Sequence, residues 1–530
     1  MAANNYSLIK FNPTRSSSSS SSLHVVMFPW LAFGHIIPFV ELSKCLAQRG
    51  HRISFLSTPK NLQRILPKIP SDLSHLINFV TLPLPQIYGL PQDAEATIDL
   101  PHDKIQYLKK AFDRLDSPFT DFLQTSFSSP TPPDWIVHDF AHHWLPPIAS
   151  KFAVPCAFFS VFKASTLAFY GPPSVLMGED GGSRSIPEHF TVPPKWVPFP
   201  SSDMVYRLYE AQKAFDDHLE DNASGVSDTY RLGSTISKTD AVFVRSCAEI
   251  ESGEWFDLLQ NEVYKKQVVQ MGGLLSPPPP LIIQEAEDKK WVEMREWLDK
   301  QRQGSVVYVA FGSEATLSQE GMIELALGLE SSELPFFWVI RSPHGSTQED
   351  YLSSVLPAGF EDRTKGRGGF ICKGWAPQDK ILGHPSVGCF LTHCGWSSVL
   401  EALSVGKVLV LLPMLIDQGL VARLLHGRKI GLEIPRDERD GSFTRDSVTE
   451  SLRVVMLDED QSESFRTKAR EMKEIFGDME RQKGYIDDLE RFMIDYVDHH
   501  VKNNANFVST PTNVTASHAA STFNSCQSLK

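Results

Sequence analysis

The chain has 530 residues, too many for one ordinary core, and this length predicts two domains plus tails. Hydrophobic residues make up 42% and charged residues 22%, a composition typical of a soluble globular protein. Its 51 basic and 64 acidic side chains give a net charge of -13, which opposes binding to nucleic acid or to an anionic membrane surface. No apolar run approaches the roughly 20 residues that a membrane-spanning helix needs. We therefore expect neither a nucleic-acid partner nor an integral membrane segment.

Seven cysteines are scattered along the chain without a Cys-x-x-Cys pair, and most lie inside apolar runs. This pattern is typical of reduced, buried thiols in a cytosolic enzyme. The residues before Leu23 contain no apolar signal-peptide core and end in seven consecutive serines, Ser16 to Ser22. We expect a cytoplasmic protein with a disordered tail over residues 1–22.

The first folded segment predicts a β-α-β unit. Residues 23–28 form a short apolar run, a loop follows through His35, a helical repeat ends at Gly50, and residues 52–56 form the next apolar run. Residues 135–138 and 241–244 are further continuous apolar runs, which are typical of a parallel sheet covered on both faces. These patterns predict a first α/β domain over residues 23–272.

A proline-rich and then charged segment over residues 273–290 predicts an extended linker. A second α/β domain is expected over residues 291–475, with strands at 306–311, 336–340, 388–391 and 408–412 and a helix at 322–329. Ile486, Leu489, Met493 and Tyr496 recur at helical spacing. They predict a last helix over residues 476–498 that packs back on the first domain, before a disordered tail over residues 499–530.

The segment from Thr392 to Ser398 follows a predicted strand and precedes a predicted helix. In open parallel sheets, ligands bind beyond the carboxyl ends of the strands, where helix N-termini offer free amides to phosphate. Gly395 could admit a diphosphate close to the backbone while His393 donates a hydrogen bond to it. Gly312 and Ser313, directly after another strand, offer a second contact, and no Mg²⁺ is then obligatory.

The stretch from Trp375 to Gln418 resembles the signature box of plant family 1 UDP-glycosyltransferases, and the resemblance extends over residues 23–497. It implies the GT-B architecture, in which two Rossmann-like domains with parallel sheets face each other, and a UDP-sugar as donor. The resemblance implies that Trp375 stacks on uracil, that Gln378 meets the base through its backbone, that Glu401 binds the ribose hydroxyls, that His393, Gly395 and Ser398 hold the phosphates, and that Trp396, Asp417 and Gln418 contact the sugar. Ser313, Ala376 and Ser397 complete the expected donor-binding set.

One position departs from the family pattern, because Ser397 stands where the family usually has Asn. Members similar to those that act on already glycosylated acceptors often share this serine, and residues 417–425 resemble that branch too. Gln418 favours UDP-glucose over UDP-galactose in the family, although the branch also includes users of UDP-rhamnose and UDP-xylose. UDP-glucose is therefore the expected donor, and the other two sugars stay open.

Structural roles compete with this interpretation residue by residue. Ser398-x-x-Glu401 also fits a helix capping box, Trp375 could be a core aromatic, and Asp417 could be a turn residue. The joint spacing favours a donor site over these separate roles.

His35 and Asp139 are the candidate catalytic residues. A histidine has the pKa needed to take a hydroxyl proton near neutral pH, provided that a carboxylate orients its ring. Both residues come directly after predicted strands of the first domain, and the resemblance places the family's base and its acid partner at these two positions. Helix capping by His35 and a turn role for Asp139 are the alternatives. His24 and His138 lie within predicted strands, whereas His142 and His143 are expected to line or cover the acceptor pocket.

Aromatic residues on the first-domain side predict an acceptor pocket for a flavonoid, terpenoid or steroid glycoside. The expected acceptor contacts are Trp30, Phe33, Trp144, Phe158 and Ser160. Base and diphosphate on opposite faces of the sugar predict direct attack that inverts the anomeric carbon. We expect a monomer without metal or cofactor, with the UDP-sugar and a small-molecule acceptor as its ligands.

Transfer to a free aglycone and a noncatalytic UDP-sugar-binding role stay open as alternatives. Asp458-Glu459-Asp460 fits the letters of a metal-binding Asp-x-Asp motif, but it follows a predicted helix and is expected to be a solvated helix end. No GxGxxG opens either sheet, which disfavours a dehydrogenase, and an epimerase would have less use for a base in the first domain.

Overall fold

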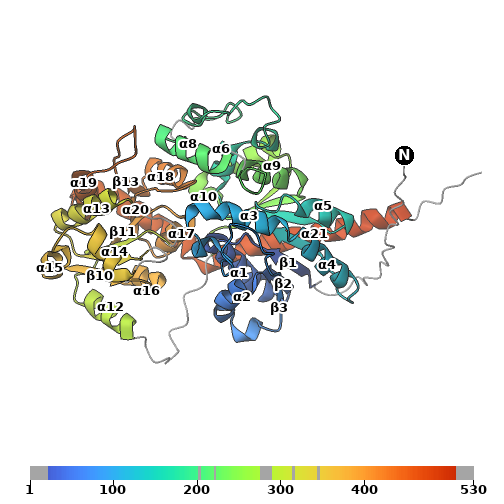
Figure 1. Ribbon diagram of the computed structural model, residues 1–530, viewed down its shortest axis with the longest axis horizontal. Helices are drawn as coiled ribbons and strands as arrows, with labels where there is room; N and C mark the ends of the chain where they lie inside the picture. The colour runs from blue at the N-terminus through green and yellow to red at the C-terminus, as the bar shows by residue number, and fades with distance from the viewer. Residues whose placement is uncertain are drawn as a thin grey trace, which may run out of the picture. The chain divides into compact units, whose positions relative to one another are not determined.

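The computed structural model describes residues 22–200, 204–219, 222–274, 289–312, 317–342 and 347–508 (Figure 1). Residues 22–490 form one compact unit that contains both sheets, and the rest of the chain is assigned to a second unit. Residues 1–21 and 509–530 of the two expected tails and residues 275–288 of the expected linker lie outside the described residues, as does Ser313.

The first sheet has seven parallel strands in the order β3-β2-β1-β4-β5-β6-β7. Its strands are β1 (His24–Phe28), β2 (Arg52–Ser57), β3 (Ile77–Thr81), β4 (Trp135–His138), β5 (Cys156–Ser160), β6 (Ala241–Val244) and β7 (Gln267–Gln270). The strand order reverses direction at β1 and β4, and a ligand crevice in an open parallel sheet forms at such a point.

The second sheet has six parallel strands in the order β10-β9-β8-β11-β12-β13. Its strands are β8 (Val306–Ala310), β9 (Phe336–Ile340), β10 (Gly369–Lys373), β11 (Val387–Thr392), β12 (Val408–Leu411) and β13 (Gly431–Glu433). Here the order reverses at β8 and β11. The α/β class with two parallel sheets is confirmed.

Helices connect the strands in both halves (Figure 1). The helices associated with the first sheet are α1 (Phe33–Ala47), α2 (Pro59–Ile65), α3 (Ile105–Asp113), α4 (Asp116–Phe127), α5 (Leu145–Lys151), α6 (Ala164–Tyr170), α7 (Pro173–Leu176), α8 (Leu208–Ala214), α9 (Asp228–Lys238), α10 (Ala248–Glu251) and α11 (Gly253–Leu258). Those of the second half are α12 (Lys289–Asp299), α13 (Gln319–Ser332), α14 (Gln348–Val355), α15 (Phe360–Lys365), α16 (Gln378–Gly383), α17 (Trp396–Ser404), α18 (Gln418–Gly427), α19 (Arg445–Met456), α20 (Glu459–Phe476) and α21 (Met479–Val508). The last helix thus continues past residue 498, where the sequence pattern ended it.

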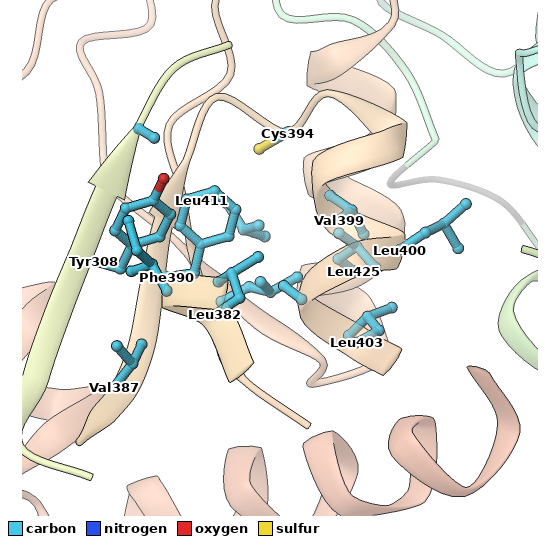
Figure 2. Packing of buried hydrophobic residues seen from close by; sticks show 14 of the residues in the cluster. Tyr308, Leu382, Val387, Phe390, Cys394, Val399, Leu400, Leu403, Leu411 and Leu425 are labelled. Atoms are coloured by element: carbon cyan, nitrogen blue, oxygen red, sulfur yellow. The ribbon is translucent and has the colours of Figure 1, made fainter. Parts of the chain in front are cut away.

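Helices cover both faces of the second sheet, so its strands are buried on both sides. One cluster contains Tyr308 and Phe390 from adjacent strands, whose rings stack with centroids 5.0 Å apart, together with Val399 of α17 (Figure 2). The apolar side of α17 therefore packs on the sheet. Packing fixes the helix N-terminus at the carboxyl end of β11.

Part of the first half is attached to the second half through α8. The Glu210 carboxylate forms an ion pair with Arg423 of α18, and the Arg423 Nε donates a hydrogen bond to the carbonyl oxygen of Val205 at 2.8 Å. A Cβ on Gly419 would lie 2.5 Å from a Glu210 carboxylate oxygen, so the two helices approach closely. Within the described ranges, no helix is long and apolar enough to cross a membrane.

Candidate active site

His35 and Asp139 are hydrogen-bonded partners. The His35 Nδ1 lies 2.8 Å from Asp139 Oδ2, and the side chains are 15% and 1% exposed. His35 lies in the first turn of α1, but Ala32 is the N-cap residue, so the capping alternative for His35 is wrong. The two residues are 104 positions apart and meet because β1 and β4 are neighbours in the sheet.

Backbone amides hold the Asp139 carboxylate in place. The Trp30 amide donates to Oδ2 at 3.1 Å and the Phe140 amide donates to Oδ1 at 2.7 Å. Each oxygen therefore has a fixed donor besides the histidine. These hydrogen bonds make the geometry of the buried carboxylate rigid.

His35 lines a cavity of about 1190 Å³ that both halves of the compact unit enclose. Phe140 and Phe162 line the cavity from the first half, and their ring centroids lie 5.6 and 6.4 Å from the His35 ring. Gly312 and Arg341 line it from the second half. The cavity thus brings the histidine and the carboxyl ends of the second sheet to one space.

The expected acceptor residues fall into two groups. Trp30 lines the cavity. Phe33, Trp144, Phe158 and Ser160 are not among the described residues that line it. Phe158 is in the core because helices cover both faces of its strand. The Ser160 hydroxyl donates to the Phe162 carbonyl oxygen at 3.1 Å and closes a local turn.

Phe33 and Trp144 have other neighbours. The Arg64 guanidinium lies 5.6 Å from the centroid of the Phe33 ring, and the Trp144 ring packs edge-on against Phe28. A direct contact of either ring with an acceptor stays a prediction.

The neighbouring histidines do not compete with His35. His138 is in β4 and His24 in β1, as expected, and burial lowers the pKa of His138 to about 4. His142 is fully buried against Phe28 and Phe112, and His143 Nδ1 lies 3.2 Å from Arg231 Nη1. Neither histidine is among the described residues that line the cavity.

The nucleoside end of the expected donor site contains a hydrogen-bonded group. The Gln378 amide donates to Glu401 Oε2 at 2.7 Å and to Ser398 Oγ at 3.1 Å. Trp375 is 68% exposed, so it is not a core aromatic, whereas Ala376 beside it is buried. The capping-box alternative for Ser398 and Glu401 is also wrong, because α17 begins earlier, at Trp396, with Gly395 as its N-cap.

The His393 ring occupies a space that two glycines leave open. A Cβ on Gly395 would lie 2.4 Å from His393 Nε2, and one on Gly312, whose φ is +70°, would lie 2.7 Å from the same atom. Burial, with a smaller contribution from the Arg341 guanidinium, lowers the pKa of His393 to about 4. The imidazole is therefore neutral at physiological pH and can donate one hydrogen bond.

The expected sugar-binding residues surround a buried lysine. Lys163 Nζ is 3.7 Å from Asp417 Oδ2 and 5.5 Å from the centroid of the Trp396 ring. Burial raises the pKa of Asp417, and Lys163 and His35 oppose this shift. Gln418 accepts from the amides of residues 414 and 415 at 2.9 and 2.8 Å through Oε1, which orders the loop before α18.

Ser397 accepts a hydrogen bond from a residue of the first half. The Arg245 Nη1 donates to Ser397 Oγ at 2.7 Å. Another contact between the halves lies next to Asp417, where the Tyr206 hydroxyl donates to the Ile416 carbonyl oxygen at 3.0 Å.

Four of these residues were missed in the sequence: Lys163, Arg245, Arg341 and Tyr206. Lys163 comes after β5 and Arg245 directly after β6. A charged residue after an apolar run was the one feature of the sequence that could have indicated these two site residues. Tyr206 lies in a segment without periodicity, and only the folded chain brings it to Ile416.

No group of three or more histidine, cysteine or acidic residues suited to a metal ion occurs in the described part of the chain. Asp458 instead caps α20, because its carboxylate accepts the amides of Asp460 and Gln461 at 3.1 and 2.9 Å. The Asp-x-Asp letters therefore mark a helix start rather than a helix end.

The chain is similar to known proteins over most of its length. The family model described as UDP-glucoronosyl and UDP-glucosyl transferase matches residues 283–502. The chain is 51% identical to UDP-glycosyltransferase 91C1 of Arabidopsis thaliana over 471 residues, which cover 89% of this chain and 96% of the relative. It is 42% identical to soyasaponin III rhamnosyltransferase of Glycine max over 476 residues, which cover 89% and 95%.

Among solved structures, a UDP-glucosyltransferase from Polygonum tinctorium in complex with 3,4-dichloroaniline has a TM-score of 0.69. Its sequence identity is 24%, and the match covers 90% of this chain and 99% of that chain. The two proteins share a fold.

Proposed function

This chain belongs to the plant family 1 UDP-glycosyltransferases, and on that premise we propose that it glycosylates a sugar hydroxyl of a small-molecule glycoside in one inverting step. The family establishes the GT-B fold and the transfer of a sugar from a UDP-sugar. The base, the stereochemistry and the acceptor belong to the proposal.

The observation that carries the proposal is the His35–Asp139 pair at the cavity. Asp139 holds Nδ1 at 2.8 Å, so the opposite ring nitrogen, Nε2, is the atom that takes the acceptor proton. The carboxylate then stabilises the imidazolium that forms. This geometry favours catalysis over a noncatalytic UDP-sugar-binding role, because a binding protein has no use for a carboxylate-oriented base.

The leaving group lies on the other side of the reaction centre. The N-terminus of α17 and the neutral His393 are placed to stabilise the diphosphate as the bond to the sugar breaks. In the proposed step the acceptor oxygen bonds to the anomeric carbon, the bond to the diphosphate oxygen breaks, and His35 keeps the proton. Attack opposite to the leaving group inverts the anomeric carbon, so an α-linked donor gives a β-glycoside, and no divalent metal takes part.

A glycoside acceptor fits the size of the cavity. Common ligand pockets hold roughly 300–1,000 Å³, and this cavity holds about 1190 Å³. The relative from Glycine max is named for a saponin acceptor and for rhamnose as the sugar transferred. We therefore favour a flavonoid, terpenoid or steroid glycoside over a free aglycone. Gln418 is the reason that UDP-glucose is the proposed donor, with UDP-rhamnose and UDP-xylose as alternatives.

The test is a matched panel of donors and acceptors. UDP-glucose, UDP-rhamnose and UDP-xylose are each combined with aglycones and their monoglucosides, and products are identified by mass. Proton NMR of the new anomeric centre reads its configuration. We expect the monoglucosides to gain the mass of one sugar, with the anomeric configuration of that sugar inverted relative to the donor. Products from free aglycones alone would contradict the glycoside assignment.

A further inference from the structure

Arg245 is a buried arginine that links the first half to the first turn of α17. It directly follows β6 and is 4% exposed. Its Nε donates to the carbonyl oxygen of Gly273 at 3.1 Å, and its Nη1 donates to Ser397 Oγ at 2.7 Å. The bond from Nε to Gly273 fixes the guanidinium, and the bond from Nη1 connects it to α17.

The main chain of the same residue makes a second contact with α17. The Trp396 indole nitrogen donates to the Arg245 carbonyl oxygen at 2.6 Å. Arg245 thus holds the first two residues of the helix, one through its side chain and one through its backbone. Both contacted residues belong to the expected donor site.

The charge of Arg245 matters because of where it lies. Burial lowers its pKa to about 10, and the Glu401 and Glu41 carboxylates oppose the shift, so the guanidinium is charged at neutral pH. A buried cation beside a helix N-terminus adds to the positive end of the helix dipole. Such an arrangement becomes favourable when an anion such as a diphosphate binds there.

We propose that Arg245 is a positioning residue of the donor site, which occupies one lone pair of the Ser397 hydroxyl and so directs its hydrogen toward the donor diphosphate. A hydroxyl accepts on two lone pairs and donates one hydrogen, so a fixed donor on one side determines where that hydrogen can point. The inference rests on the proposed donor site and gives Ser397 a function at the position where the family usually has Asn.

A double-mutant cycle tests the coupling between the two residues. UDP affinity is measured by calorimetry without acceptor for the wild type, Arg245→Met, Ser397→Ala and the double variant, with Arg245→Lys as the conservative variant. Each single change is expected to weaken UDP binding about tenfold, and the double variant is also expected to bind about tenfold more weakly. Arg245→Lys should bind UDP at least about threefold more tightly than Arg245→Met, because lysine keeps a charged donor.

Ser404→Ala is the matched control, since Ser404 is also on α17 but its hydroxyl donates to the Glu401 carbonyl oxygen at 2.8 Å. UDP affinity should not change in this variant. With donor varied, Ser397→Ala should raise KM about tenfold and leave kcat within about threefold. A merely structural role would lower the melting temperature without this split.

If the two residues act independently, the double variant will bind UDP about a hundredfold more weakly than the wild type, and this result would overturn the inference. So would unchanged UDP affinity in Ser397→Ala. If Arg245→Met does not fold, the cycle of Arg245→Lys and Ser397→Ala decides in the same way. A chain that shows the coupling in UDP binding but transfers no sugar supports the positioning role and counts against the proposed function.

Discussion

Lys163 and Asp417 form a buried ion pair that joins the two halves of the compact unit, with Nζ 3.7 Å from Oδ2 and Lys163 fully buried. Lys163 also donates to Thr166 Oγ1 at 2.8 Å. A buried charge that loses its partner is costly, so each residue of the pair depends on the other. The pair lies where the transferred sugar is expected. Protonation of the Asp417 carboxylate should therefore affect both the stability of the protein and its activity with the UDP-sugar donor.

Replacing Lys163 with Met should move the acid limb of the pH profile of kcat/KM to higher pH. Burial already raises the pKa of Asp417 and Lys163 opposes that shift, so without the lysine the carboxyl is protonated at higher pH. An opposite charge at this distance changes a carboxyl pKa by about 1–3 units, and a shift of about one unit is expected. Activity measured from pH 4.5 to 8 checks this.

The same variant should lose more stability at high pH than at low pH. An acid whose folded pKa exceeds the unfolded value of about 3.9 destabilises the fold once it ionises, as pH rises through that window. Melting temperatures of Lys163→Met and wild type should therefore diverge with rising pH. The double variant Lys163→Met with Asp417→Asn should show no such divergence, and an unmoved acid limb would refute the coupling.

Replacing His35 with Ala should lower kcat by about 10²–10⁴-fold while UDP binding is unchanged, because the residue acts on the acceptor hydroxyl and not on the nucleotide. Turnover is followed by product mass and UDP affinity by calorimetry. His75, an exposed histidine of the first half, provides the control variant His75→Ala. Wild-type turnover in His35→Ala would remove this residue from the mechanism.

Replacing Gly395 with Ala should abolish most UDP binding. The added Cβ would lie 2.4 Å from His393 Nε2, and relieving such an overlap costs about 1–3 kcal/mol or displaces the imidazole. UDP affinity should fall at least about tenfold. Gly383 at the end of α16 is the control, since a Cβ there meets nothing within 4 Å, and Gly383→Ala should bind UDP normally.

UDP binding at pH 5 should be accompanied by proton uptake at His393. Its pKa of about 4 leaves the imidazole neutral in the unliganded protein, and a bound diphosphate raises that pKa. Calorimetry in buffers of different ionisation enthalpy measures the proton uptake, which should disappear in His393→Gln. Equal uptake in wild type and variant would assign the proton to another group.

Replacing Gln418 with Ala should weaken donor selection. Its Oε1 accepts two backbone amides, so its NH₂ group is the part that can face a sugar hydroxyl. The ratio of kcat/KM for UDP-glucose to that for UDP-galactose is expected to fall about tenfold. An unchanged ratio would remove Gln418 from sugar selection.

The fold was accessible from the sequence because parallel strands buried on both faces appear as continuous apolar runs. Residues 241–244 and 408–411 are such runs, and both are strands. The juxtaposition of His35 and Asp139 was also predictable, since residues after neighbouring parallel strands lie at one edge of the sheet.

Contacts between the two halves, and the choice between pocket and core for an aromatic residue, were not accessible from the sequence. Phe158 was expected in the acceptor pocket because aromatic rings suit both a pocket and a core, and composition does not distinguish them. Arg245 and Ser397 are 152 positions apart, and no local pattern connects them. A core position was the alternative for Trp375, and the folded chain excludes it because the side chain is 68% exposed.

The contact between α8 and α18 bears on how the chain could be divided. Arg423 is mostly buried, and its carboxylate partners are Glu210, from the half that carries the first sheet, and Glu433 of β13. A fragment beginning at α12 would keep the second sheet and Glu433 but would lack Glu210. The Arg423 guanidinium would then have one carboxylate partner instead of two. Separated halves would have to reassociate to restore the Glu210–Arg423 ion pair, because this pair joins one half to the other.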